Sequence, residues 1–212
     1  MDLYFTRHGK TEWNLAGRFQ GMMGDSPLLP TSHDEIKQFG QHVKEIPFAK
    51  VYASTSKRAQ DTAKGIVSQL AQPVEIISTP DLRELGLGTL EGRSIESRRK
   101  HFAETLDNMR YRMDLYDPTP FEGEPIDQAI ARVVNVVTQA VADNTTDQPL
   151  LFVGHGASLT SSIQWLAGKS LAEVRSQGGL LNSSLTILEA VEPKRELPYQ
   201  LKLWNDVSFL TE

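Results

Sequence analysis

Histidine and arginine side chains follow three apolar segments of this sequence, at the point where each segment ends. Arg7 and His8 come directly after "LYFT", and His155 comes directly after "LLFVG". Arg58 lies a few residues beyond a third apolar segment, "VYA". A guanidinium group holds phosphate oxygens in a bidentate way, and a neutral imidazole can act as a nucleophile. These residue types could therefore form a site for phosphate chemistry, provided that the fold brings them together.

The pattern of apolar residues predicts strands that alternate with helices. Short apolar runs indicate strands at 3–6, 51–53, 74–77, 150–154, 184–190 and 199–206. Helices are indicated at 32–46, 59–70, 126–141 and 159–166, with a charged helix at 94–112. The first helix has the spacing of a capping box at Ser32 and Glu35. We expect an α/β fold, a three-layer α/β/α sandwich with a mostly parallel central sheet.

The carboxyl ends of parallel strands share one edge of a sheet, and ligands bind outside that edge. If the three strands are neighbours, both histidines and both arginines meet there. Helices that begin after residues 56 and 156 would add backbone N–H donors and positive dipole ends. Taken alone, Arg58 could be a solvated helix residue and Glu84 a surface carboxylate. The combination of a nucleophile, anion-binding groups and an acid favours a functional site.

Composition limits the classes of function. The chain has 212 residues, no cysteine and a formal net charge of −5 at pH 7. This negative charge argues against nucleic acid or an anionic membrane as the main partner. The absence of cysteine fits a reducing cytoplasm, and the start of the chain reads as a strand rather than a signal peptide. His33, His42 and His101 stand in predicted helices without metal-ligand spacing, so we expect no metal and no cofactor.

Six motifs of the sequence resemble those of the histidine phosphatase superfamily, also called the phosphoglycerate-mutase-like family. In the family's order they are "RHGKTEWN" (7–14), "GRFQG" (17–21), "DSPL" (25–28), "SKRAQDTA" (56–63), "LRELGLGTLEG" (82–92) and "GHG" (154–156). The resemblance spans most of the chain and implies a single domain over 1–212. Two stretches depart from the family pattern, namely Lys10 and the residues 55–57, and neither removes a catalytic group.

The resemblance also implies a role for each matching residue. His8 would be the phosphorylated nucleophile, Glu84 the proton donor, and Arg7, Arg58 and His155 the rest of the phosphate pocket. The residues implied to contact phosphate are Arg7, Asn14, Gln20, Gly21, Arg58, His155 and Gly156. Such a site would work without a metal, because arginines would hold the charge of the phosphoryl group.

Three functions remain open at this stage. The first is a phosphomonoesterase of the histidine acid type that acts on a small phosphorylated metabolite. The second is a cofactor-dependent phosphoglycerate mutase, although mutases of the family carry "ERHYG" around the acid, where this chain has "LRELGLGTLEG". The third is a module that binds phosphorylated ligands without catalysis, which loss of His8, Glu84 or an arginine would suggest. None of these residues is lost, so the phosphatase is favoured.

The segment 94–124 is expected to form a cap or lid over the pocket, because long excursions between core elements often shape specificity. Its arginines either form a solvated helix face balanced by glutamates, or face the pocket and favour a substrate with a second acidic group. The last strand, 199–206, could be an unprotected edge that pairs with a second copy in a homodimer.

Overall fold

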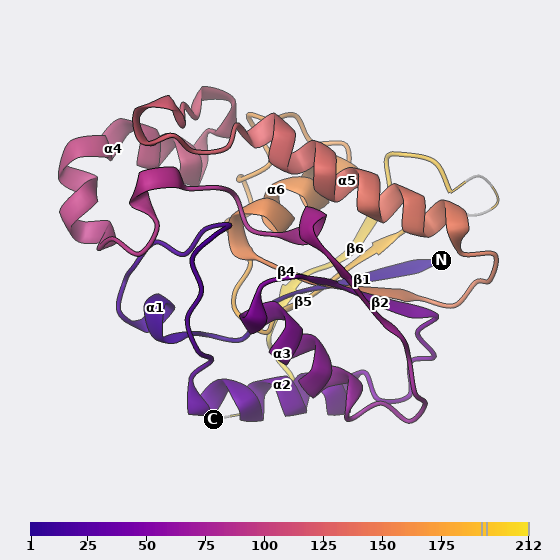
Figure 1. The fold of residues 1–212 in the computed structure, drawn as a ribbon. Coiled ribbons are helices and arrows are strands. Elements are labelled where there is room, and N and C mark those ends of the chain that lie inside the picture. The colour runs from indigo at the N-terminus through magenta and orange to yellow at the C-terminus, as the bar shows by residue number, and fades with distance from the viewer. Residues whose placement is uncertain (192, 194, 212) are drawn as a thin grey trace.

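The centre of the structure is a six-stranded, mostly parallel sheet (Figure 1). The computed structural model describes residues 1–191, 193 and 195–211. The strands are β1 (Asp2–Arg7), β2 (Lys50–Ser54), β3 (Ile76–Thr79), β4 (Leu150–Gly154), β5 (Leu185–Glu189) and β6 (Gln200–Asp206). Their spatial order is β3-β2-β4-β1-β5-β6. The first four are parallel, whereas β5 and β6 run antiparallel to their neighbours.

Helices cover both faces of the sheet and form the outer two layers. They are α1 (Glu12–Leu15), α2 (Pro30–His42), α3 (Lys57–Val67), α4 (Ile95–Tyr111), α5 (Ile126–Asp143) and α6 (Gly156–Leu166). In Figure 1, α2 and α3 pack together below the sheet, and α5 and α6 pack together above it. The predicted three-layer α/β/α architecture is confirmed.

Strand β4 shows why a solid apolar run forms a central strand. All five of its residues are buried. Successive side chains of a strand point to opposite faces, so Leu150 and Phe152 join the core beneath α5 and α6. Leu151 and Val153 join the second core, against α2 and α3. An apolar residue is therefore needed at every position, and the strand lies between β1 and β2.

Several predicted boundaries are wrong; α2 and α3, for example, end at His42 and Val67 rather than at 46 and 70. Helix α2 begins at Pro30 with Leu29 at its N-cap, so the capping box predicted at Ser32 does not form. Ser32 is the third residue of the helix, and its hydroxyl donates to the carbonyl of Lys10 at 2.8 Å. The sequence spacing does not reveal this tertiary partner. Strand β3 occupies Ile76–Thr79 rather than 74–77, because these four residues pair with β2.

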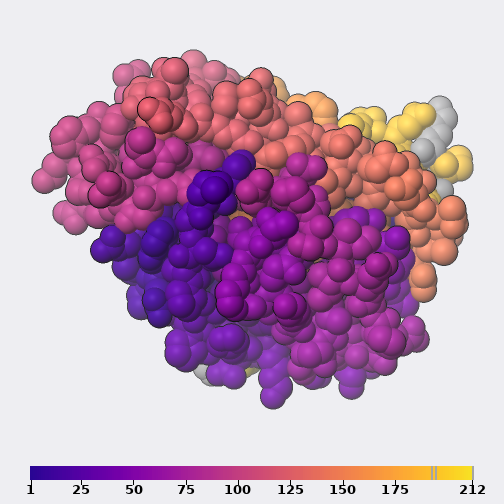
Figure 2. Space-filling model, in the orientation of Figure 1, coloured from indigo at the N-terminus to yellow at the C-terminus, as the bar shows by residue number. Residues whose placement is uncertain are grey.

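The segment 94–124 lies beside the end of the sheet where the parallel strands finish. It contains α4 and the short 3-10 helices Met113–Leu115 and Thr119–Phe121. Its buried side chains, Leu106, Met113 and Phe121 among them, form a third apolar cluster together with the start of α5. In Figure 2 this segment forms the upper left of the surface, beside the indigo N-terminal residues.

Two further features bear on the expectations above. In the described part of the chain, the structure contains no helix with the length and apolar character needed to cross a membrane. Strand β6 lies at one edge of the sheet and pairs only with β5 among the described strands. Pairing of this edge with a second copy stays a prediction.

Candidate active site

Three adjacent strands bring the two histidines together at the carboxyl edge of the sheet. Strand β4 lies between β1 and β2, and Arg7 pairs in register with Gly154. His8 and His155, the residues that follow these two strands, therefore stand side by side, with ring centroids 5.1 Å apart at an interplanar angle of 62°. Both side chains are buried, with exposures of 3% and 0%.

Hydrogen bonds define which nitrogen of His8 is free to react. Its Nδ1 lies 2.7 Å from the carbonyl oxygen of Gly9. A carbonyl can only accept, so Nδ1 carries the hydrogen and Nε2 keeps its lone pair. Burial is the largest cause that holds the pKa of His8 well below its usual value, and the charges of Arg58 and Arg7 add to it. The imidazole is therefore neutral at physiological pH.

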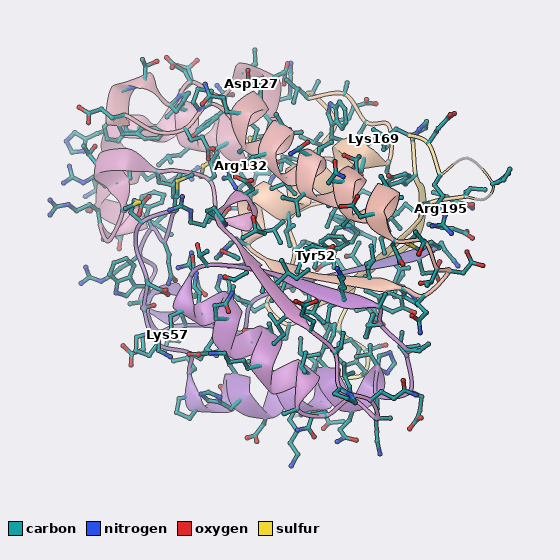
Figure 3. All side chains as sticks on the ribbon, turned by 45° about the vertical axis from the view of Figure 1, so that its right-hand side comes forward. Tyr52, Lys57, Asp127, Arg132, Lys169 and Arg195 are labelled. Atoms are coloured by element: carbon teal, nitrogen blue, oxygen red, sulfur yellow. The ribbon has the colours of Figure 1, made fainter. Side chains whose placement is uncertain are left out.

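Arg58 is held by the loop that precedes α2. The side chain is 1% exposed, and its Nε donates to Nε2 of His8 at 3.3 Å. Its other nitrogens donate to the carbonyls of Gly21 and Gly24 and to Oδ1 of Asp25, at 3.1, 2.7 and 3.1 Å. Asp25 also accepts from the backbone N–H of Lys57 at the start of α3 (Figure 3). The predicted phosphate residue Gly21 thus contacts Arg58 through its carbonyl.

Arg7 lies against the start of α6. Its Nη1 donates to the carbonyl of Leu180 at 2.9 Å, while its Nε is buried and has no hydrogen-bond partner among the described residues. A Cβ on Gly156 would lie 3.2 Å from Cζ of Arg7, so glycine leaves room for the guanidinium. Burial lowers the pKa of Arg7, and the charge of Glu84 opposes that shift.

His155 is oriented by a serine at the end of β2. Its Nε2 lies 2.7 Å from Oγ of Ser54, and its Nδ1 is buried without a hydrogen-bond partner in the described residues. Burial is again the largest cause that lowers the pKa of His155 well below its usual value, followed by the charge of Arg58. The second imidazole is also neutral, with one ring nitrogen left for a ligand.

Glu84 lies at the N-terminus of α6. Its carboxylate accepts three backbone N–H groups, from Leu85 and Ser158 at 2.8 Å and from Ala157 at 3.0 Å. The side chain is 8% exposed. These three contacts fix the carboxylate at the start of α6.

An ion pair between α5 and the residues that precede it holds the segment that carries Glu84. Arg132 (Figure 3) and Glu124 form a two-point pair at 2.8 and 2.9 Å, and both side chains are largely buried. Arg132 also donates to three carbonyls of that segment, those of Asp81, Arg83 and Glu84. Glu124 accepts from the backbone N–H of Gly86 at 3.0 Å. The backbone is thus bound on both sides of Glu84.

A cavity of about 460 Å³ opens at this edge of the sheet. Its walls include five of the predicted site residues, namely Arg7, Asn14, Gln20, Glu84 and Gly156. The side chains of His8, Arg58 and His155 are not among the wall residues, and all three are buried. The segment 94–124 supplies Ile95, Arg99, Leu106, Met109 and Arg110 to the wall. Asn14 and Gln20 each hydrogen-bond Thr11.

Sequence reasoning missed several residues that shape this site. Ser54 ends an apolar strand, as Arg7 does, so its place at the strand end could have indicated it. Asp25 stands in the quoted "DSPL" motif but received no role. Arg132, Glu124 and Arg175 carry no local signal, because the backbone groups that they contact lie 38 or more residues away in the sequence. No group of three or more metal-ligating side chains occurs in the described ranges.

A mostly parallel sheet thus brings two histidines, two arginines and a carboxylate together at one edge of an α/β fold. The chain belongs to the histidine phosphatase superfamily (branch 1), whose family model matches residues 3–207. The predicted family is therefore confirmed.

Relatives of known name fall into two groups. The chain is 30% identical to "Probable phosphoglycerate mutase GpmB" of Proteus mirabilis, over all of this chain and 96% of that protein. It is 29% identical to "Metal-independent phosphoserine phosphatase" of Arabidopsis thaliana, over 99% of this chain and 83% of that protein. Both names occur among sequences of similar identity, so identity does not separate phosphatase from mutase.

Solved structures share the fold along the whole chain. YhfR of Bacillus stearothermophilus superposes with a TM-score of 0.86 at 28% identity, covering 98% of each chain. A mycobacterial glucosyl-3-phosphoglycerate phosphatase complexed with VO3 superposes with a TM-score of 0.82 at 24% identity, covering 96% of this chain and 98% of that one. The second likeness concerns the fold alone.

Proposed function

We propose that this protein is a metal-independent phosphomonoesterase that acts on small phosphorylated metabolites through a phosphohistidine on His8. One observation carries the proposal. The hydrogen bond from Nδ1 of His8 to the carbonyl of Gly9 leaves Nε2 as an unprotonated nucleophile, and Arg58 lies against that same nitrogen. A neutral nucleophile beside two guanidinium groups suits attack on a phosphate ester.

In the first step, Nε2 of His8 attacks phosphorus in line with the leaving oxygen. The N–P bond forms as the P–O bond to the leaving group breaks. Arg7, Arg58 and Nδ1 of His155 donate to the phosphoryl oxygens, whose charge they stabilise as preorganised groups. With the Ser54 hydroxyl as donor to Nε2 of His155, its Nδ1 carries the hydrogen for this contact. Asn14, Gln20 and the start of α6 at Gly156 complete the phosphate contacts.

Glu84 supplies the proton that the departing alkoxide needs. In the ligand-free structure its carboxylate accepts three backbone N–H groups. A dianionic phosphate that approaches these donors competes with the carboxylate and favours its protonated form. In the second step, Glu84 takes a proton from water, which attacks phosphorus and breaks the N–P bond. Free His8 and inorganic phosphate result.

The segment 94–124 is proposed to act as a cap over the substrate. It contributes five wall residues to the cavity. Its Leu106, Met113 and Phe121 pack in an apolar cluster that also includes Leu85 and Leu87, next to Glu84. We propose that the wall residues of this segment contribute to substrate selection.

The second candidate is a phosphoglycerate mutase, and the names of several relatives favour it. In a mutase the phosphohistidine would return its phosphoryl group to a bound sugar acid rather than to water. The glycine-rich segment at 82–92 lacks the "ERHYG" sequence of such enzymes, which favours the hydrolase.

Phosphate release separates the candidates. The purified protein, treated with a chelator, is assayed with p-nitrophenyl phosphate and with phosphoglycerate, each with and without 2,3-bisphosphoglycerate. We expect inorganic phosphate to be released from both without the bisphosphate. Phosphoglycerate isomerisation that needs the bisphosphate, without net phosphate release, would establish the mutase instead. Tight phosphate binding with no turnover of any ester would indicate a binding module.

A further inference from the structure

Arg175 lines the same cavity as Arg7 and Glu84, although no motif contains it. It lies between α6 and β5, in a segment that the sequence analysis did not assign to the site. Its Nε donates to the carbonyl of Arg110 at 3.4 Å, and so it connects the body of the protein with α4. Its Nη1 is buried and has no hydrogen-bond partner among the described residues.

The cavity has a strong excess of positive charge. Its charged wall residues are one carboxylate, Glu84, and five arginines, namely Arg7, Arg18, Arg99, Arg110 and Arg175. Of these five, only Arg99 forms an ion pair with a carboxylate in the described part of the chain, and its partner is Asp107. The protein as a whole carries a formal charge of −5. A local concentration of unpaired arginines in an acidic protein is the feature expected of an anion-binding cavity.

The backbone next to Arg175 leaves room for its guanidinium group. A Cβ on Gly179 would lie 3.3 Å from Nη2 of Arg175, a separation tighter than most real Cβ contacts. Gly156 stands in the same relation to Arg7, with 3.2 Å to Cζ. Two cavity arginines thus each face a glycine in the wall. One of these arginines is the proposed phosphate ligand, and the other has no assigned ligand.

A purely structural role does not account for Arg175. Structural arginines have their N–H groups satisfied, since a buried donor without an acceptor costs free energy. Burial and the nearby charges of Arg7 and Arg110 lower the pKa of Arg175, and only the charge of Glu84 among the main causes raises it. A bound anion would supply the missing acceptor and offset the repulsion between the arginines.

We propose that Arg175 binds a second anionic group of the substrate, so that the preferred substrate is a small phosphate ester with a carboxylate or a second phosphate at its far end. The inference rests on the proposed function, because it places the ester phosphate at Arg7 and His8. The apolar wall residues Phe19, Leu87 and Met109 would contact the carbon chain between the two anionic groups.

A matched series of esters tests the proposal. Propyl phosphate, phosphooxypropanoate and propanediol bisphosphate share a three-carbon chain and differ at the far end, which is a methyl, a carboxylate or a phosphate group. For at least one of the two esters with an anionic far end, we expect kcat/KM to be about 10- to 100-fold higher than for propyl phosphate. This is the range of a charge-assisted hydrogen-bond pair. The better of the two identifies the anion.

Two substitutions connect this preference to Arg175. In Arg175→Met the ratio of kcat/KM between the preferred ester and propyl phosphate should fall to within about threefold of one. Arg175→Lys should retain part of the ratio, because lysine keeps the charge but not the bidentate fork. Arg93→Met, which removes an exposed arginine outside the cavity wall, is the matched control and should keep the full ratio.

Binding to His8→Ala, measured by calorimetry with the same three esters, gives a readout that does not depend on turnover. If the protein hydrolyses all three esters at similar rates, the second-anion site is overturned and the phosphatase stands. If no ester is hydrolysed, the proposed function fails, and the ratio of dissociation constants with and without Arg175→Met still decides the site. An unchanged ratio in a folded Arg175→Met protein contradicts the proposal.

Discussion

Arg58 donates a hydrogen bond from its Nε to Nε2 of His8 across 3.3 Å, so a permanent cation lies against the nitrogen that we assign as the nucleophile. The opposite ring nitrogen is held by the carbonyl of Gly9. These two contacts orient the imidazole before substrate arrives, and burial is the largest cause that lowers its pKa and keeps it neutral. The same guanidinium can donate to an incoming phosphoryl oxygen. In the proposed mechanism it therefore contacts the nucleophile in the free protein and the phosphate in the complex.

The neutral state of His8 predicts how stability depends on pH. Above pH 6.5 the imidazole is neutral in both the folded and the unfolded chain, and its contribution is fully present. Because the folded pKa is lowered, the unfolded chain binds a proton first as the pH falls below 6.5. The free energy of unfolding should then fall by up to about 1.4 kcal/mol per pH unit for this histidine.

Urea unfolding of the protein and of His8→Gln between pH 7.5 and 4.5 checks this. In the acidic range, the substitution should reduce the slope of the free energy of unfolding against pH by up to the same amount. His155→Gln should do likewise, since burial also lowers the pKa of His155. A slope that neither substitution changes would show that these imidazoles are not held neutral by the fold.

The pair Arg132 and Glu124 should affect catalysis through the position of Glu84. Arg132→Met leaves a largely buried carboxylate without its partner, and the free energy of unfolding should fall by about 3–5 kcal/mol. The kcat/KM of an alkyl phosphate should fall more than that of p-nitrophenyl phosphate, because only the alkoxide needs a well-placed acid. Equal losses for both esters in a folded variant would limit the pair to a structural role.

Activity should survive removal of metal ions. In the proposed mechanism Arg7, Arg58 and the start of α6 hold the charge of the phosphoryl group, and a chelator removes none of them. Phosphate release from p-nitrophenyl phosphate is measured after dialysis against EDTA and again after addition of Mg²⁺ or Zn²⁺. We expect the same rate under both conditions, within about twofold. A complete loss of activity that added metal restores would contradict the proposed mechanism.

The sequence predicted the parts of the fold that depend on local pattern. The run at 150–154 indicated a central parallel strand because every residue is apolar, and β4 is buried on both faces. The breaks at 56 and 156 indicated helix starts, and α3 and α6 begin at Lys57 and Gly156. The order of the strands depends on tertiary contacts and cannot be predicted from these local patterns. The observed adjacency of β1, β4 and β2 nevertheless agrees with the expectation that the motifs lie together at one edge.

Features that depend on distant partners could not be predicted. The Ser32 hydroxyl donates to a carbonyl 22 residues away, and so it does not form the capping box that the sequence pattern predicts. Arg132 contacts carbonyls 48 to 51 residues away, and nothing in the helical pattern of 126–141 marks it. Glu91, which the glycine-rich loop offers as a second carboxylate, instead accepts backbone N–H groups of Met23 and Gly24.

The assignment of Glu84 as the acid predicts a dependence on the leaving group. Glu84→Gln keeps the shape of the side chain but cannot give up a proton. The rate with an alkyl phosphate should fall by about 10²–10⁴-fold, the usual contribution of a general acid. With p-nitrophenyl phosphate, whose leaving group departs without a proton, the first step should suffer less and phosphoenzyme should accumulate.

Glu91→Gln is the matched control for this substitution. Glu91 lies in the same glycine-rich loop but is not a wall residue of the cavity. Any loss it causes should be equal for good and poor leaving groups, as expected of a residue that holds the loop at 23–24. If the leaving-group dependence appears with Glu91→Gln and not with Glu84→Gln, the two carboxylates have been assigned in the wrong order.

The most direct test of the mechanism is to trap the phosphoenzyme. Glu84→Gln is mixed with ³²P-labelled p-nitrophenyl phosphate, quenched with alkaline detergent within the first turnover, and digested for peptide mapping. We expect an acid-labile, alkali-stable label on the peptide that contains His8, and no label when His8→Ala is introduced into the same variant. Label on another residue, or hydrolysis that persists in His8→Ala, would contradict it.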